Sequence, residues 1–221
     1  MSDLREMFVD ELRDLYDAEK QLTKAIPKMA KAASNPELKQ GFTEHLEQTK
    51  LQVARLEKCF ELLGERARSK PCSGMKGIVE EGKEQMQEDL SDALMDAALN
   101  GAAKRVEHYE MAGYQAAVEM AKALKETEVV PLLQQTLDEE TQMDRRLSQL
   151  GKTLLKTALA EGEEEEEAAP ARASAAKSAK SKARGNSGSS KQARGSSKVS
   201  KSARSGGQPL SQTPVDDEEI T

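Results

Sequence analysis

The sequence predicts an all-α protein that folds as a four-helix bundle and ends in a disordered basic tail. Apolar residues recur at steps of three and four in four long segments, which is the period of one helix face. No segment shows a convincing strand pattern. From residue 168 the composition changes to mostly Ala, Ser, Lys, Arg and Gly, which cannot form a packed core.

The first two helices are separated by a short break. An apolar face runs from a predicted N-cap at Ser2 to about Ala33, and Pro27 is expected to kink or loosen this helix. The sequence SNP at residues 34–36 combines capping residues with a proline that suits a first turn. The second helix is therefore predicted over residues 36–63.

The remaining elements are one short and two long helices. A short helix is predicted over residues 74–88, and an Ala-rich third long helix over residues 91–125. Thr127 is expected to cap the fourth, which should end near Ala160. Only the connection between the second and third long helices is long, and this single crossover is the ferritin-like arrangement.

This pattern divides the chain into a helical domain, residues 1–160, and a tail, residues 161–221. Residues 168–221 carry a net charge of +6, which leaves −12 on the rest of the chain. The acidic body should repel nucleic acid. With two cysteines, no signal-peptide pattern and no apolar run of membrane length, we expect a cytoplasmic protein without membrane contact.

Polar residues interrupt the apolar faces of all four long helices. Each falls at a three- or four-residue step between apolar neighbours, or one turn from such a position: Glu19, His45, Glu107, Glu110, Glu140 and Asp144. At about 1.5 Å per residue, Glu19, His45, Glu110 and Glu140 are expected at similar heights, near the middle of the bundle. We expect the matched four to meet inside the bundle, with the other two assisting.

Buried carboxylates that meet without a cation repel one another, and their pKa values rise. One or two bound divalent ions would relieve that repulsion. Carboxylate and imidazole donors suit iron, manganese or zinc. The sequence thus supports a metal site, for which we expect iron or manganese.

The alternative interpretation is a chance alignment, because a third of the chain is charged. Acids such as Glu107 and Glu139 could then lie at the edge of the seam, in solvated salt bridges with Lys104, Arg105 or Arg145. The tyrosines near these acids could hydrogen-bond the ligands or simply pack at the edge of the core. They are Tyr16, Tyr109 and Tyr114.

Four segments carry a family resemblance: ELRDLYDAEKQL, EHLEQT, AAKRVEHYEMAGY and LLQQTLDEET. Over about residues 3–155 the chain resembles the bacterial stress-induced ferritin-like family typified by YciE and YciF. The resemblance implies a homodimer of four-helix bundles with an extra short helix, similar to the di-iron part of rubrerythrins. It also implies a link to general stress responses.

The sequence departs from the ferritin ligand pattern, which places Glu-x-x-His on two of the helices. No Glu-x-x-His is present, and Met143 stands where a histidine is expected. The pair Glu107-x-x-Glu110 resembles the extra carboxylate pair of rubrerythrin. Ferroxidase or peroxidase activity, and the number of metal ions, therefore stay open.

The tail begins with five glutamates at residues 163–167, which are expected to end the last helix. Its basic residues could contact DNA phosphates without reading sequence, and no aromatic residue is present to stack on bases. The alternative is a solubilising linker.

Two functions follow from these patterns. The first is a stress-protection metalloprotein that handles peroxide or iron. The second is a non-enzymatic dimeric scaffold whose tail binds nucleic acid non-specifically.

Overall fold

The computed structural model describes residues 3–184, and side chains as far as residue 164. Within that part every regular element is a helix, which confirms the all-α prediction. The helices are α1 (Leu4–Ala32), α2 (Pro36–Leu62), α3 (Ser73–Gln85), α4 (Asp92–Leu124) and α5 (Val130–Arg184).

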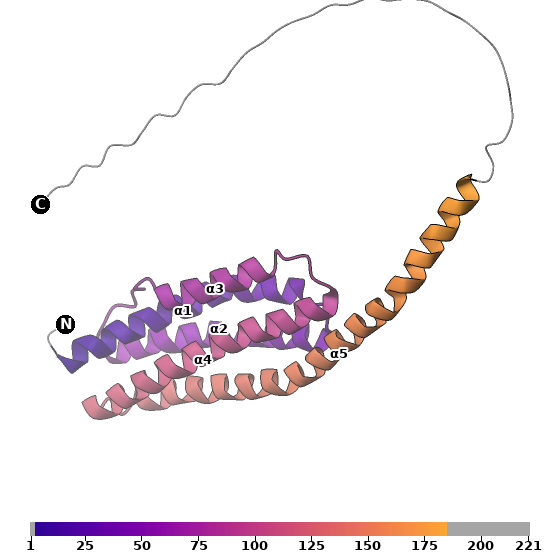
Figure 1. Ribbon diagram of the computed structural model, residues 1–221. Helices are drawn as coiled ribbons and strands as arrows, with labels where there is room; N and C mark the ends of the chain where they lie inside the picture. The colour runs from indigo at the N-terminus through magenta and orange to yellow at the C-terminus, as the bar shows by residue number, and fades with distance from the viewer. Residues whose placement is uncertain (1–2, 185–221) are drawn as a thin grey trace, which may run out of the picture. The chain divides into compact units, whose positions relative to one another are not determined.

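The arrangement is the expected ferritin-like bundle with one long crossover. Helices α1, α2, α4 and α5 are the four long helices, and α3 lies in the connection between α2 and α4 (Figure 1). The short helix packs on α1 and α4. The described residues as far as Ser174 form one compact unit.

Helix starts follow ordinary capping chemistry, with one shift from expectation. The N-cap of α1 is Asp3, whose carboxylate accepts a hydrogen bond from the Glu6 backbone N–H at 2.8 Å. The predicted cap at Ser2 was therefore wrong by one residue. Asn35 caps α2 and Pro36 occupies its first turn, as the SNP sequence indicates.

The last helix is longer than predicted. Instead of ending near Ala160, α5 continues to Arg184 and includes the glutamate run that was expected to end it. Ala, Glu, Lys and Arg fill most of residues 161–184, and these are among the best helix formers. The predictions of disorder and of nucleic-acid contact for residues 185–221 lie outside the described residues.

The core contains two apolar clusters with polar residues between them. One cluster includes Leu22 and Phe42, and the other includes Leu15 and Phe60. Along each long helix, buried polar side chains stand between members of the two clusters. We call them the polar layer: Glu19, His45, Thr49, Gln52, Glu107, Glu110, Thr136 and Glu140. These residues are enclosed by apolar packing at both ends.

Among the described helices, none combines the length and the apolar content that crossing a membrane requires.

Candidate metal centre

Each long helix contributes acidic or imidazole groups to the polar layer. Glu19 comes from α1, His45 from α2, the pair Glu107 and Glu110 from α4, and Glu140 from α5. None of these five side chains is more than 4% exposed. Glu107 therefore lies in the interior, not in a solvated salt bridge at the edge of the seam.

Four of these residues form a compact donor cluster: His45, Glu107, Glu110 and Glu140. Each offers one nitrogen or oxygen atom, and these atoms all lie within 4.8 Å of one another. His45 Nε2 is 3.4 Å from Glu107 Oε1, but neither ring nitrogen of His45 has a hydrogen-bond partner. Such spacing lets one or two ions contact several of these atoms at once.

Several buried oxygens of the cluster lack a donor. Both carboxylate oxygens of Glu110 and Oε2 of Glu107 and Glu140 have no hydrogen-bond partner among the described residues. A buried polar atom without a partner is rare in folded proteins and needs an explanation. A bound cation would explain these oxygens, because it would be their missing partner.

Glu19 lies beside this cluster and is held by a tyrosine. The Tyr114 hydroxyl on α4 donates a 2.5 Å hydrogen bond to Glu19 Oε1, which leaves Glu19 Oε2 without a partner. Tyr114 is fully buried. The other two tyrosines bind carboxylates outside the cluster: Tyr16 donates to Glu57, and Tyr109 donates to Asp14.

Burial perturbs the protonation of these groups. Desolvation, followed by repulsion from neighbouring carboxylates, raises the pKa values of Glu19, Glu107 and Glu110 well above the ordinary range. Desolvation also lowers the pKa of His45, which favours the neutral imidazole that binds metals. It raises the pKa of Tyr114 as well, so its hydroxyl stays a donor.

Asp144 does not join the cluster. Its Oδ1 accepts a 2.6 Å hydrogen bond from Lys104 Nζ and lies 3.1 Å from His108 Nε2, whose side chain is largely exposed. Burial alone would raise the pKa of Asp144, but the contacts with Lys104 and His108 together outweigh it and the pKa is lowered. This engaged carboxylate at the rim is therefore left out of the proposed ligand set.

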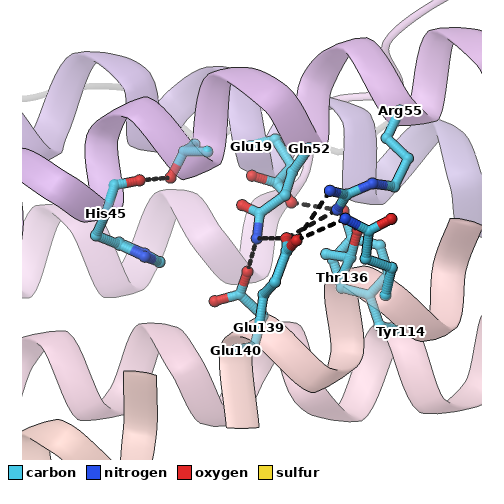
Figure 2. A network of polar contacts seen from close by, with 10 residues as sticks. Glu19, His45, Gln52, Arg55, Tyr114, Thr136, Glu139 and Glu140 are labelled. Atoms are coloured by element: carbon cyan, nitrogen blue, oxygen red, sulfur yellow. Dashed lines mark hydrogen bonds and ion pairs between the residues drawn. The ribbon is translucent and has the colours of Figure 1, made fainter. Parts of the chain in front are cut away.

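The sequence patterns missed a hydrogen-bonded group on the α2–α5 side, shown in Figure 2. Gln52 Nε2 donates to Glu140 Oε1 and, at 3.2 Å, to Glu139 Oε2. Arg55 donates to both oxygens of Glu139, at 2.8 and 2.9 Å, and also to the Thr136 hydroxyl. Glu139 thus pairs with Arg55, not with the basic residues of α4 and α5 that its sequence position suggested.

A signal for part of this group was present in the sequence. Gln52 follows His45 by seven residues, a two-turn step along the inner face of α2. The Arg55–Glu139 pair gave no such signal, since it joins two helices at the edge of the seam.

The donor set fits a transition-metal ion. Carboxylates with free oxygens and a neutral imidazole converge in a dry interior, and the nearby cation, Arg55, is already bound to Glu139. When ionised, the four glutamates of the polar layer carry four negative charges with no cation among them. Two divalent ions would balance that charge.

Residues 3–160 match the family described as Domain of unknown function (DUF892). Protein YciF of Escherichia coli K12 is 38% identical over 151 residues, which is 68% of this chain and 91% of YciF. The crystal structure of that E. coli stress protein superposes with a TM-score of 0.69 at 36% identity, covering 71% of this chain and 99% of YciF.

A second solved structure is similar. It is YcfI of Rhodopseudomonas palustris, which its description assigns provisionally to the structural proteins. It has a TM-score of 0.66 at 36% identity and covers 66% of this chain and 94% of YcfI.

Proposed function

Because the chain belongs to the DUF892 family and resembles a bacterial stress protein, we propose that it is a stress-response protein that binds iron or manganese in its polar layer. His45, Glu107, Glu110 and Glu140 would hold the metal, with Glu19 beside them. The expected role is the handling of peroxide or iron.

One observation carries this proposal: the buried, unpartnered carboxylate oxygens that face one another across helices. Without a cation, the fold keeps mutually repelling groups in a water-poor layer between two apolar clusters. A bound divalent ion would replace this repulsion with attraction, because it supplies the missing partner for each oxygen. Carboxylates with an imidazole suit iron and manganese.

The chain's own residues would prepare the site for the ion. Tyr114 fixes the orientation of Glu19, and Gln52 fixes that of Glu140. The apolar clusters on either side limit access of water. Bound iron or manganese would supply one-electron redox chemistry toward peroxide or oxygen.

Metal analysis of the purified full-length protein tests the proposal. We expect stoichiometric iron or manganese after aerobic or anaerobic loading and removal of excess metal. A double variant, Glu110→Ala with Glu140→Ala, should lose it, whereas Asp144→Ala should keep it because Asp144 is bound to Lys104. A wild-type protein that stays metal-free under both conditions contradicts the proposal.

A scaffold without enzymatic activity is the second candidate, and the description of YcfI favours it. In that case the polar layer is only a hydrogen-bonded network. Metal would then leave the melting temperature unchanged. A rise in melting temperature on metal addition, lost in the double variant, separates the two functions.

Three further proposals concern partners and location. We propose a homodimer, a cytoplasmic location and non-specific DNA contact through residues 168–221.

The DNA proposal has a direct test. Deleting residues 168–221 should abolish salt-sensitive DNA retardation. Full-length protein that fails to retard DNA at low salt contradicts the DNA proposal.

A further inference from the structure

We infer that Gln52 is a further metal ligand and binds through its amide oxygen. This inference rests on the proposed metal site and adds to it a neutral oxygen donor from α2. Gln52 is fully buried, and its side chain lies in the polar layer next to Glu140 (Figure 2).

The hydrogen bonds of Gln52 fix which way its amide faces. Its Nε2 lies between the carboxylates of Glu140 and Glu139 and donates to both. Both oxygens of Glu139 also accept hydrogen bonds from Arg55, so this carboxylate is an acceptor, and exchanging the amide nitrogen and oxygen would set oxygen against oxygen. The nitrogen is therefore committed to the α5 side, and Oε1 takes the other branch of the amide.

Within residues 3–184, that oxygen has no hydrogen-bond donor. Gln52 Oε1 is a buried atom without a partner, like the free oxygens of Glu107, Glu110 and Glu140. The same amide group donates to Glu140, a member of the donor cluster, so Gln52 Oε1 lies one short amide group from a carboxylate oxygen of Glu140. A cation in the cluster would supply the partner that the protein does not.

A rigid outer contact keeps the amide in place. Arg55 holds both oxygens of Glu139, and its other bond goes to the Thr136 hydroxyl. Glu139 in turn receives Gln52 Nε2. The amide is thus anchored from the side away from its oxygen, as expected for a preorganised ligand.

An amide oxygen changes the character of the donor set. With Gln52 included, His45 supplies the one nitrogen donor of the proposed ligand set and all the other donors are hard oxygen atoms. Hard oxygen sites suit manganese and iron(II) better than they suit copper. In the ferritin pattern a second histidine would provide a second neutral donor, but Met143 occupies that position on α5. In this chain Gln52 would provide the second neutral donor instead, from α2.

Two substitutions at this position separate a ligand from a residue that only orients Glu140. Gln52→Met removes both the donor and the oxygen at similar length. Gln52→Glu removes the Nε2 donor but keeps an oxygen that can bind metal. Full-length protein freed of metal would be titrated with Mn²⁺ by calorimetry, and the folding of each variant checked by circular dichroism.

We expect Gln52→Met to weaken Mn²⁺ binding by about tenfold or more, and Gln52→Glu to retain affinity within about threefold of wild type. X-ray absorption of the bound manganese should show fewer oxygen or nitrogen neighbours in Gln52→Met only. Gln135→Met is the matched control, because Gln135 is exposed and also donates to Glu139, at 3.0 Å. It should bind Mn²⁺ like wild type.

Equal losses in the Met and Glu variants would overturn the inference, because Gln52 would then act only through Glu140. Unchanged binding and coordination in Gln52→Met would overturn it as well. In both cases the metal site survives if Glu110→Ala with Glu140→Ala still abolishes binding. Wild-type protein that binds no Mn²⁺ and no iron would remove both proposals together.

Discussion

At the scale of single residues, the polar layer stores electrostatic repulsion that ordinary cores avoid. Glu110 shows this most clearly, since both of its oxygens are buried and neither has a hydrogen-bond donor in the part of the chain that the structure describes. Its pKa is raised by desolvation and then by Glu19 and Glu140. A residue kept at such a cost to stability is expected to serve a ligand.

Replacing Glu110 with Gln should have opposite effects on stability and binding. Without metal, Glu110→Gln should raise the free energy of unfolding at neutral pH, because the variant no longer has to bury or protonate a carboxyl group whose pKa is raised in the folded state. Its metal affinity should fall by about tenfold or more. Chemical denaturation and Mn²⁺ titration measure the two effects, with exposed Glu128→Gln as the control. A destabilised metal-free variant would contradict this prediction, because it would mean that the Glu110 carboxyl has a stabilising partner even without metal.

The Tyr114 hydroxyl should contribute more to the stability of the fold than a hydroxyl at the surface. Tyr114→Phe leaves Glu19 without its buried donor and should lower the free energy of unfolding by roughly 1–3 kcal/mol. Tyr16→Phe is the matched control, because Tyr16 donates at 2.7 Å to the exposed Glu57. It should cost less, since water can replace the lost bond. Equal losses in urea denaturation would contradict the burial argument.

At the scale of elements, the short helix α3 is fixed by a close contact with α4. A Cβ atom at Gly74 would lie 2.5 Å from Tyr109 Cε2, whereas a Cβ at Gly77 would meet nothing within 4 Å. The Tyr109 hydroxyl also lies 3.0 Å from Cys72 Sγ, at the start of α3. Both contacts place the crossover against the bundle.

The two glycines of α3 should respond differently to alanine. Gly74→Ala forces the Tyr109 ring to move and should destabilise the protein by roughly 1–3 kcal/mol. Gly77→Ala has room and should stabilise it by up to about 1 kcal/mol, through helix propensity. Thermal melts of the pair provide the measurement. A harmless Gly74→Ala would mean that α3 shifts freely on α4.

The end of α4 offers a second test at this scale. Lys125 closes the helix with φ of 60°, the left-handed conformation that glycine adopts without steric strain. Lys125→Gly should therefore stabilise the protein by about 0.5–1 kcal/mol. Lys122→Gly, inside the last turn, should instead destabilise it by about 1 kcal/mol. Denaturant midpoints that move in the same direction for both variants would refute this assignment.

At the scale of the whole molecule, the two apolar clusters give the fold its stability and the polar layer opposes them. All four long helices meet in this layer, so its protonation state affects the entire bundle. Metal binding and folding should therefore be coupled.

This coupling predicts a pH dependence for the metal-free protein. The pKa values of Glu19, Glu107 and Glu110 are raised above the ordinary 4.5, so between 4.5 and the raised values the folded state holds more protons than the unfolded chain. The free energy of unfolding must then fall as pH rises through that window.

The measurement compares wild type with a variant carrying Gln at all three positions. Carboxylates outside the polar layer, such as Asp144, have lowered pKa values and make the free energy of unfolding rise with pH. Their contribution is the same in both proteins and cancels in the difference. Wild type minus variant should therefore decrease with rising pH in urea denaturation. A difference that stays constant would show that these carboxyls titrate normally.

The sequence determined the helices and the faces that they bury, because the period of apolar residues along a helix is a local property. It also marked Glu19, His45, Glu110 and Glu140 as polar residues in phase with the core. The end of α5 was less predictable, since Gly162 and Pro170 oppose the strong helix propensity of the Ala and Glu residues around them.

Only the tertiary structure decided which polar groups meet. A step of four residues keeps Asp144 near the face of Glu140, yet one turn along α5 it reaches Lys104 of α4. Gln52 enters the layer because Glu139 of the facing helix α5, which is itself held by Arg55 of α2, accepts a hydrogen bond from its amide. Such pairings depend on the rotation and height of one helix against another. These are set by packing across the whole bundle, which no single helix encodes.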